Sequence, residues 1–109
     1  MAKFLITASY TSEGTRGLLT EGGSGRKAVL EKAIKGLGGT LEAMYFAYGD
    51  DDVLLIADVP NAVSGLALSL AANASGTVRV KTTPLITVEE IDAACKTSVK
   101  YRGAGAAAV

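Results

Sequence analysis

The chain has 109 residues, which is enough for one domain with a single core. Its 11 basic and 11 acidic residues cancel, so it lacks the basic excess that nucleic-acid-binding domains normally show, and no nucleic-acid partner is expected. Histidine is absent, which excludes zinc and haem sites that need imidazole and catalytic dyads or triads built on it.

The hydropathy pattern, the cysteine count and the apolar fraction indicate the cellular compartment and the contacts of the chain. No apolar stretch approaches the ~20 residues that span a bilayer, and the N-terminal segment becomes polar too early for a secretory signal, so no membrane partner is expected. Cys95 is the only cysteine, which excludes an internal disulfide and fits a reducing cytoplasm. The apolar fraction of 49% is high for a small domain and suggests that another chain buries part of the surface.

The first third of the chain predicts a strand followed by helical segments. Residues 3–10 alternate in polarity, so they predict a strand with one face formed by Phe4, Ile6, Ala8 and Tyr10. A short helix is predicted over residues 14–19, capped by Thr11 or Ser12. Three glycines within residues 22–25 then predict a loop. Helical spacing of apolar residues predicts a longer helix over residues 26–37.

Two strands joined by an acidic turn come next, over residues 40–47 and 53–59. The second of them is apolar almost throughout, which is typical of a central strand covered on both faces. A helix over residues 62–74 follows. Its spacing predicts an inward face formed by Val63, Leu66, Ala67, Leu70 and Ala71.

A fourth strand is predicted over residues 77–86, and Pro84 within it fits an edge strand or a bend. Thr87, with Glu90 three residues later, predicts a capping box that opens a last helix running to about Val99. The order strand-helix-strand-strand-helix-strand is that of a ferredoxin-like plait, an α+β fold, with an extra C-terminal helix. Helices cover one face of such a sheet, so we expect two sheets to pair face to face.

Several segments of the chain resemble the GYD-domain family of small bacterial proteins. They are FLITASYTSEGTRGLL, EGGSGRKAVLEKAIKGLGGTLEAMYFAYGDDDVLLIADVP, the run from Gly76 to Thr87, and SVKYRGAG. The resemblance covers nearly the whole chain. It implies one ferredoxin-like domain over residues 1–100 that forms a dimeric α/β barrel, followed by a tail over residues 101–109. It implies no biochemical activity.

The turn that gives the family its name has the pattern Gly-x-Tyr-Asp. The corresponding residues in this chain are Gly49, Asp50, Asp51 and Asp52, so an aspartate replaces the tyrosine and any role of that tyrosine is not carried over. The three carboxylates either bind a hard cation or form a charged turn that keeps the end of the sheet soluble. The further ligands of a calcium loop are missing, so we favour the charged turn; a cation shared between turns of adjacent subunits is the remaining alternative.

Two other groups of residues are candidate binding sites. Ser24, Gly25 and Arg26 precede the predicted long helix, where free amides and a positive charge either hold an anion or form an ordinary connector. The second group could line the space between sheet and helices or the mouth of a barrel, and either binds an anionic aromatic ligand or forms interface hydrogen bonds. It consists of Tyr10, Arg16, Tyr45, Arg79 and Lys81.

Two functions follow from these observations. The first is a non-enzymatic, homo-oligomeric domain for assembly or small-ligand binding, with no cofactor. The alternative is a cofactor-independent enzyme of the dimeric-barrel type, similar to small monooxygenases, in which Tyr10, Tyr45 and Arg79 position a small aromatic or anionic substrate. The glycine- and alanine-rich tail over residues 101–109 is expected to dock on a neighbouring subunit, and Cys95 is expected to be a packing residue.

Overall fold

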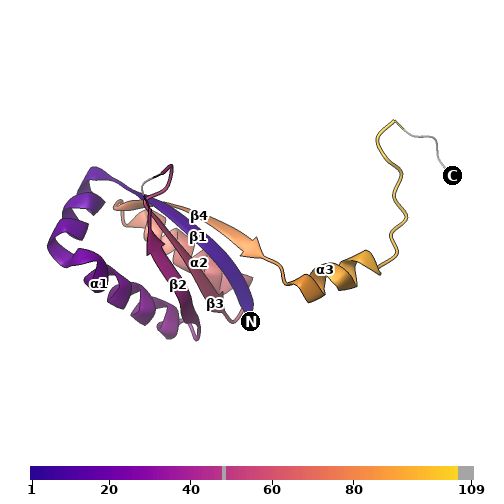
Figure 1. Cartoon of the computed structure of the whole chain (residues 1–109), viewed down its shortest axis with the longest axis horizontal. Helices are drawn as coiled ribbons and strands as arrows, with labels where there is room; N and C mark the ends of the chain where they lie inside the picture. Colours follow the sequence, from indigo (N-terminus) through magenta and orange to yellow (C-terminus); the bar gives the residue numbers. More distant parts are fainter. Residues whose placement is uncertain (48, 106–109) are drawn as a thin grey trace.

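Four antiparallel strands form one sheet, and two helices lie against one of its faces (Figure 1). The structure, a computed structural model, describes residues 1–47 and 49–105. The elements, in chain order, are β1 (Ala2–Tyr10), α1 (Ser12–Gly36), β2 (Thr40–Phe46), β3 (Val53–Val59), α2 (Ala62–Ala74), β4 (Val78–Leu85) and α3 (Val88–Cys95). The strand order is β2-β3-β1-β4. This α+β arrangement is consistent with a ferredoxin-like plait.

The core lies between the sheet and its two covering helices. Alternate residues of β1 and β3 point toward the helices, and Ile6 lies opposite Leu55 in the pairing of the two strands. Ile34 of α1 packs onto them and is fully buried. The predicted inward face of the first strand is therefore confirmed: Phe4, Ile6 and Ala8 are buried, and Tyr10 is half-buried.

The opposite face of the sheet is apolar at its centre and is not covered by α1 or α2. Leu5, Leu54 and Ile56 lie on this face and are only half-buried in the single chain. Tyr45 of β2, paired with Leu54, lies beside them and keeps about two-thirds of its surface exposed. The third strand was predicted to be covered on both faces, and within one chain only one of its faces is covered.

Helix α1 differs from the prediction. The predicted interruption between two helical segments is confirmed, but it is shorter than the expected loop over residues 22–25, because helical geometry extends from Ser12 to Gly36 with a break at Gly22. Only Gly22 departs from helical geometry, with a φ of +76° that glycine adopts without steric cost. The helix is therefore kinked at a single residue. Its start is capped by Thr11, whose side chain accepts a hydrogen bond from the Gly14 N–H.

Helix α2 has the predicted bounds, but the predicted inward face is wrong. The residues expected to face inward are exposed, and Gly65 is buried in their place, with Leu68 half-buried beside it. A Cβ atom added to Gly65 would lie 2.6 Å from the ring of Phe4. The helix therefore approaches the sheet most closely at Gly65, and the large side chains of the predicted face, Val63, Leu66 and Leu70, point outward. Ala67 and Ala71 are also exposed, although Ala71 borders the space between the sheet and the helices.

The C-terminal part of the chain extends away from the sheet (Figure 1). Pro84 lies on the edge strand β4, as predicted. The capping box of α3 is also confirmed, with both hydrogen bonds between Thr87 and Glu90 at 3.0 Å. Residues 86–105 are all exposed, so Cys95 is not the packing residue that was predicted. Helix α3 ends at Cys95 instead of near Val99. The predicted docking of the tail remains a prediction, and its residues 106–109 lie outside the described residues.

Among the described residues, none of the helices combines the length and the apolar character that crossing a membrane requires.

Candidate functional site

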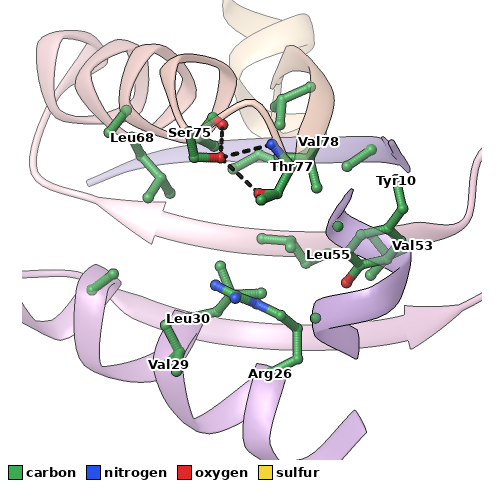
Figure 2. Close-up of a pocket in the computed structure, with 18 of the residues that line it drawn as sticks. Tyr10, Arg26, Val29, Leu30, Val53, Leu55, Leu68, Ser75, Thr77 and Val78 are labelled. Carbon is green, nitrogen blue, oxygen red and sulfur yellow. Dashed lines mark hydrogen bonds between the residues drawn. The ribbon is translucent and has the colours of Figure 1, made fainter. Parts of the chain in front are cut away.

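A pocket of about 530 Å³ lies between the sheet and the two helices (Figure 2). Its floor is formed by the helix-facing side of β1, β3 and β4, and its walls by α1 and α2. Most of the lining side chains are apolar; those of the floor are Ile6, Ala8, Val53, Leu55 and Val80, and those of the walls include Val29, Leu30, Ala33, Leu68 and Ala72. The size and composition are those of a small-molecule site.

The kink of α1 shapes this pocket. The first helical segment, residues 12–21, contributes Gly14, Gly17 and Leu18, and the segment after Gly22 forms a second wall. The first segment is fixed to the turn between α2 and β4. The Thr11 N–H donates to the Thr77 carbonyl at 3.0 Å, and the Thr11 hydroxyl donates to the Gly76 carbonyl at 2.8 Å. One kinked helix therefore closes the pocket on two sides.

One end of the pocket is polar. Tyr10, Glu21 and Arg26 line it, and Nη1 of Arg26 lies 3.3 Å from Oε1 of Glu21 in an ion pair that is about one-third exposed (31% and 32%). Figure 2 shows the Tyr10 and Arg26 side chains extending into the space between the sheet and the helices. Burial raises the pKa of Tyr10, Arg26 opposes this rise, and Glu21 and Asp52 add to it. The phenol is therefore protonated at neutral pH and can donate a hydrogen bond.

Two of the hydroxyl groups that line the pocket, those of Ser75 and Thr77, are engaged with neighbouring groups, as the dashed lines in Figure 2 show. The hydroxyl of Ser75 lies 2.6 Å from the Ala72 carbonyl, to which it donates, and 2.7 Å from the hydroxyl of Thr77. The Thr77 N–H donates to the same Ser75 oxygen at 3.2 Å. Because these two hydroxyls already have partners, polar recognition of a ligand falls mainly to Tyr10, Glu21 and Arg26, and Tyr10 lies beside Thr77 through its pairing with Val78.

The acidic turn supports the pocket through Asp52. The Asp52 carboxylate accepts a hydrogen bond from the Tyr10 N–H at 2.8 Å, and its own N–H donates to the Ala8 carbonyl at 2.9 Å. These two bonds fix the end of β1 from which Tyr10 enters the pocket. A carboxylate oxygen of Asp51, the second aspartate of the turn, lies 3.3 Å from Nζ of Lys81 in an ion pair. Within residues 1–47 and 49–105, no three acidic or cysteine side chains converge as a metal site requires.

Replacing Asp52 by alanine is expected to lower the free energy of unfolding by about 1–3 kcal/mol, because the Tyr10 N–H loses its acceptor in a partly buried place. The matched control is Asp50→Ala. Asp50 is exposed and accepts a hydrogen bond from Ser9 through its backbone oxygen, which alanine retains, so a change of less than about 0.5 kcal/mol is expected. Urea unfolding of both variants measures the difference, and equal midpoints would contradict this role of Asp52.

The structure does not bring the predicted site residues together in one place. Tyr10 lines the pocket, whereas Tyr45, Arg79 and Lys81 lie on the opposite face of the sheet. Arg79 and Lys81 border a polar depression there, next to Ser9, Asp50 and Asp51. Arg16 is exposed on α1.

The predicted anion-binding residues lie within a helix and not in a loop. Ser24 is exposed, and a Cβ atom added to Gly25 would lie 2.7 Å from Cγ of Glu21. Of the three residues, Arg26 lines the pocket, where it pairs with Glu21. Glu21 itself was missed. The signal that could have found it is the spacing of Gly14, Gly17, Leu18 and Glu21, which places all four on one helix face.

A family model described as the GYD domain matches residues 4–95. The matched region includes all four strands, except for the first two residues of β1. It also includes all of the residues that line the pocket. Comparisons with curated proteins and with solved structures give no significant match.

Proposed function

Because the chain belongs to the GYD-domain family, and because the matched region includes a complete apolar pocket, we propose that it is a non-enzymatic binding domain for a small, mainly apolar molecule and that it works as a homo-oligomer. The pocket between the sheet and the helices is the observation that carries the binding part of this proposal. The open face of the sheet supports the oligomer.

The pocket has the properties of a binding site rather than of a packing defect. Its volume of about 530 Å³ lies within the range of roughly 300–1,000 Å³ that is usual for small-molecule sites. Part of its apolar lining remains exposed to water (Val29 at 47%), so an apolar occupant would bury surface that the single chain leaves open. A few polar groups at one end of an apolar space are the usual means of orienting a ligand.

The open face of the sheet has the anatomy of an interface between two copies. Leu5, Leu54 and Ile56 form an apolar centre that is half-buried in the single chain. Charged residues surround that centre: Lys3 pairs with Glu42 and with Asp58 at one end of the sheet, and Lys81 pairs with Asp51 at the other. An apolar centre within a polar rim is typical of protein interfaces. Face-to-face pairing of two such sheets gives the dimeric α/β barrel that we propose.

Catalysis is the alternative to binding, and the placement of the side chains favours binding. A dimeric-barrel enzyme of the monooxygenase type was expected to position its substrate with Tyr10, Tyr45 and Arg79. Tyr10 lines the pocket, while Tyr45 and Arg79 lie on the other face of the same sheet. A substrate held in the pocket of one chain can therefore contact Tyr10 of that chain, but not its Tyr45 or Arg79.

Filling the pocket tests the proposed binding. Gly17 lines the pocket, and an added Cβ atom there meets no atom within 4 Å, so Gly17→Leu places a side chain in the open space. We expect this variant to bind a neutral naphthalene-based dye, whose emission rises in apolar surroundings, on the order of tenfold more weakly than the natural chain. Fluorescence titration measures the affinity.

The matched control is Gly36→Leu. Gly36 is also a helical glycine of α1 with no atom within 4 Å of an added Cβ atom, but it does not line the pocket. Both substitutions raise helix propensity, so stability does not separate them. Gly36→Leu is expected to bind the dye as the natural chain does. Equal affinity of all three proteins would show that the dye binds elsewhere, and no binding by the natural chain would overturn the proposal.

A further inference from the structure

The polar end of the pocket combines groups of different hydrogen-bonding capacity. Arg26 can only donate hydrogen bonds, the carboxylate of Glu21 can only accept them, and the phenol of Tyr10 can do both. All three line the same end of the pocket, and Tyr10 and Arg26 extend into it (Figure 2). A ligand that fills the apolar part of the pocket meets these three groups with one of its ends.

The charges around this end disfavour an anion. Arg26 contributes one positive charge, which the Glu21 carboxylate already faces at 3.3 Å. The Asp52 carboxylate, which binds the Tyr10 N–H, adds a second negative charge that acts on the Tyr10 side chain. A ligand carboxylate or phosphate would therefore meet the Glu21 carboxylate and the Arg26 guanidinium in the pocket lining, with the Asp52 carboxylate behind Tyr10 as a second negative charge. A ligand ammonium would in turn lie beside Arg26 and leave the donors of that guanidinium without an acceptor.

An uncharged hydroxyl group meets both requirements, since it accepts from Arg26 or Tyr10 and donates to Glu21. We propose that the pocket takes an apolar ring or chain that carries one uncharged hydroxyl, an alcohol or a phenol, with that hydroxyl at Tyr10, Glu21 and Arg26. This inference rests on the proposed function and adds the chemical class of the ligand to it.

Four probes with the same ring test the preference for a hydroxyl: naphthol, naphthoate, naphthylmethylamine and unsubstituted naphthalene. The chain contains no tryptophan, so naphthalene emission is measured without a tryptophan background. At neutral pH the full-length natural chain is expected to bind naphthol on the order of tenfold more tightly than each of the other three. Naphthalene measures the contribution of the apolar walls alone.

Substitution of Glu21 tests the electrostatic part of the inference. Glu21→Gln removes one negative charge and leaves Arg26 without its carboxylate partner, so naphthoate is expected to gain on the order of tenfold relative to naphthol. The control is Glu13→Gln, which removes the same charge from the first turn of α1, away from the pocket. It should leave the order of the four probes unchanged.

Substitution of Tyr10 tests the hydrogen bond. Tyr10→Phe keeps the ring and removes the hydroxyl, so the advantage of naphthol over naphthalene should fall by several-fold. Tyr45→Phe makes the same chemical change on the open face of the sheet and should leave that advantage intact.

The results separate this inference from the proposed function. If all four probes bind the natural chain equally well, the hydroxyl preference is overturned while the binding pocket stands. Tightest binding of naphthoate or of the amine by the natural chain overturns the hydroxyl preference in the same way, as does an unchanged probe order in Glu21→Gln. If none of the four probes binds, the proposed function fails and the inference fails with it.

Discussion

Gly14→Ala is expected to lower the free energy of unfolding by roughly 3 kcal/mol, although alanine is the better helix former. A Cβ atom at residue 14 would lie 1.9 Å from the carbonyl oxygen of Thr77, a backbone atom that a rotamer change cannot move. The first segment of α1 would therefore have to leave the turn before β4. It would lose the two hydrogen bonds by which Thr11 holds that turn, at 3.0 and 2.8 Å.

The matched control for this substitution is Gly17→Ala, three residues further along the same helix. No atom lies within 4 Å of an added Cβ atom there, so the gain in helix propensity is expected to stabilise the chain by about 0.5–1 kcal/mol. Each variant adds one methyl group, and the two positions lie about one helical turn apart. The two substitutions are expected to change the free energy of unfolding in opposite directions. Urea unfolding measures both, and equal midpoints would contradict the close approach of α1 to the β4 end.

Ile56→Lys is expected to separate the proposed dimer into monomers. Ile56 lies at the centre of the open sheet face, next to β1, and its side chain is half-buried in the single chain, so a lysine there can reach solvent in the monomer. In a face-to-face pair both copies would bury an unpaired ammonium group, which is strongly unfavourable. We expect association to weaken on the order of a hundredfold, measured by native mass spectrometry at micromolar concentration.

The control for the assembly experiment is Val63→Lys, which puts the same charge on the exposed outer face of α2. This variant is expected to keep the copy number of the natural chain. If Val63→Lys dissociates the assembly and Ile56→Lys does not, the outer face of α2 is the interface and the open sheet face is not. A natural chain that is monomeric at micromolar concentration would overturn the proposed assembly itself.

The strands were predictable because their pattern depends on nearest neighbours. Alternation along β1 predicted that Phe4, Ile6 and Ala8 share the buried face, and they do. The bounds of β3, Val53–Val59, were predicted to the residue, because the acidic turn and Pro60 leave a strand no room to extend. Likewise, the start of α3 was predictable because a capping box is a purely local arrangement.

The two helices that form the walls of the pocket were less predictable. α2 is apolar on all sides, so its pattern does not reveal which face is buried; the close approach of Gly65 to Phe4 decides, and it is a tertiary contact. Of the three glycines within residues 22–25 of α1, Gly22 alone has a positive φ and forms the bend. Nothing in the local sequence distinguishes Gly22 from Gly23 or Gly25. The pocket depends on both of these outcomes. Sequence reasoning therefore found Tyr10 and Arg26 as polar candidates but could not place them in one site.

The position of β1 in the sheet has a consequence for how the chain is made. β1 is synthesised before the other strands, yet it lies between β3 and β4, and its second residue, Lys3, pairs with Leu85, the last residue of β4. β1 therefore cannot pair with both of its neighbouring strands, β3 and β4, until β4 has left the ribosome. Contacts of such wide separation are closed late and slowly. A ribosome-bound chain that ends before β4 therefore leaves one edge of β1 unpaired, and unpaired strand edges favour aggregation.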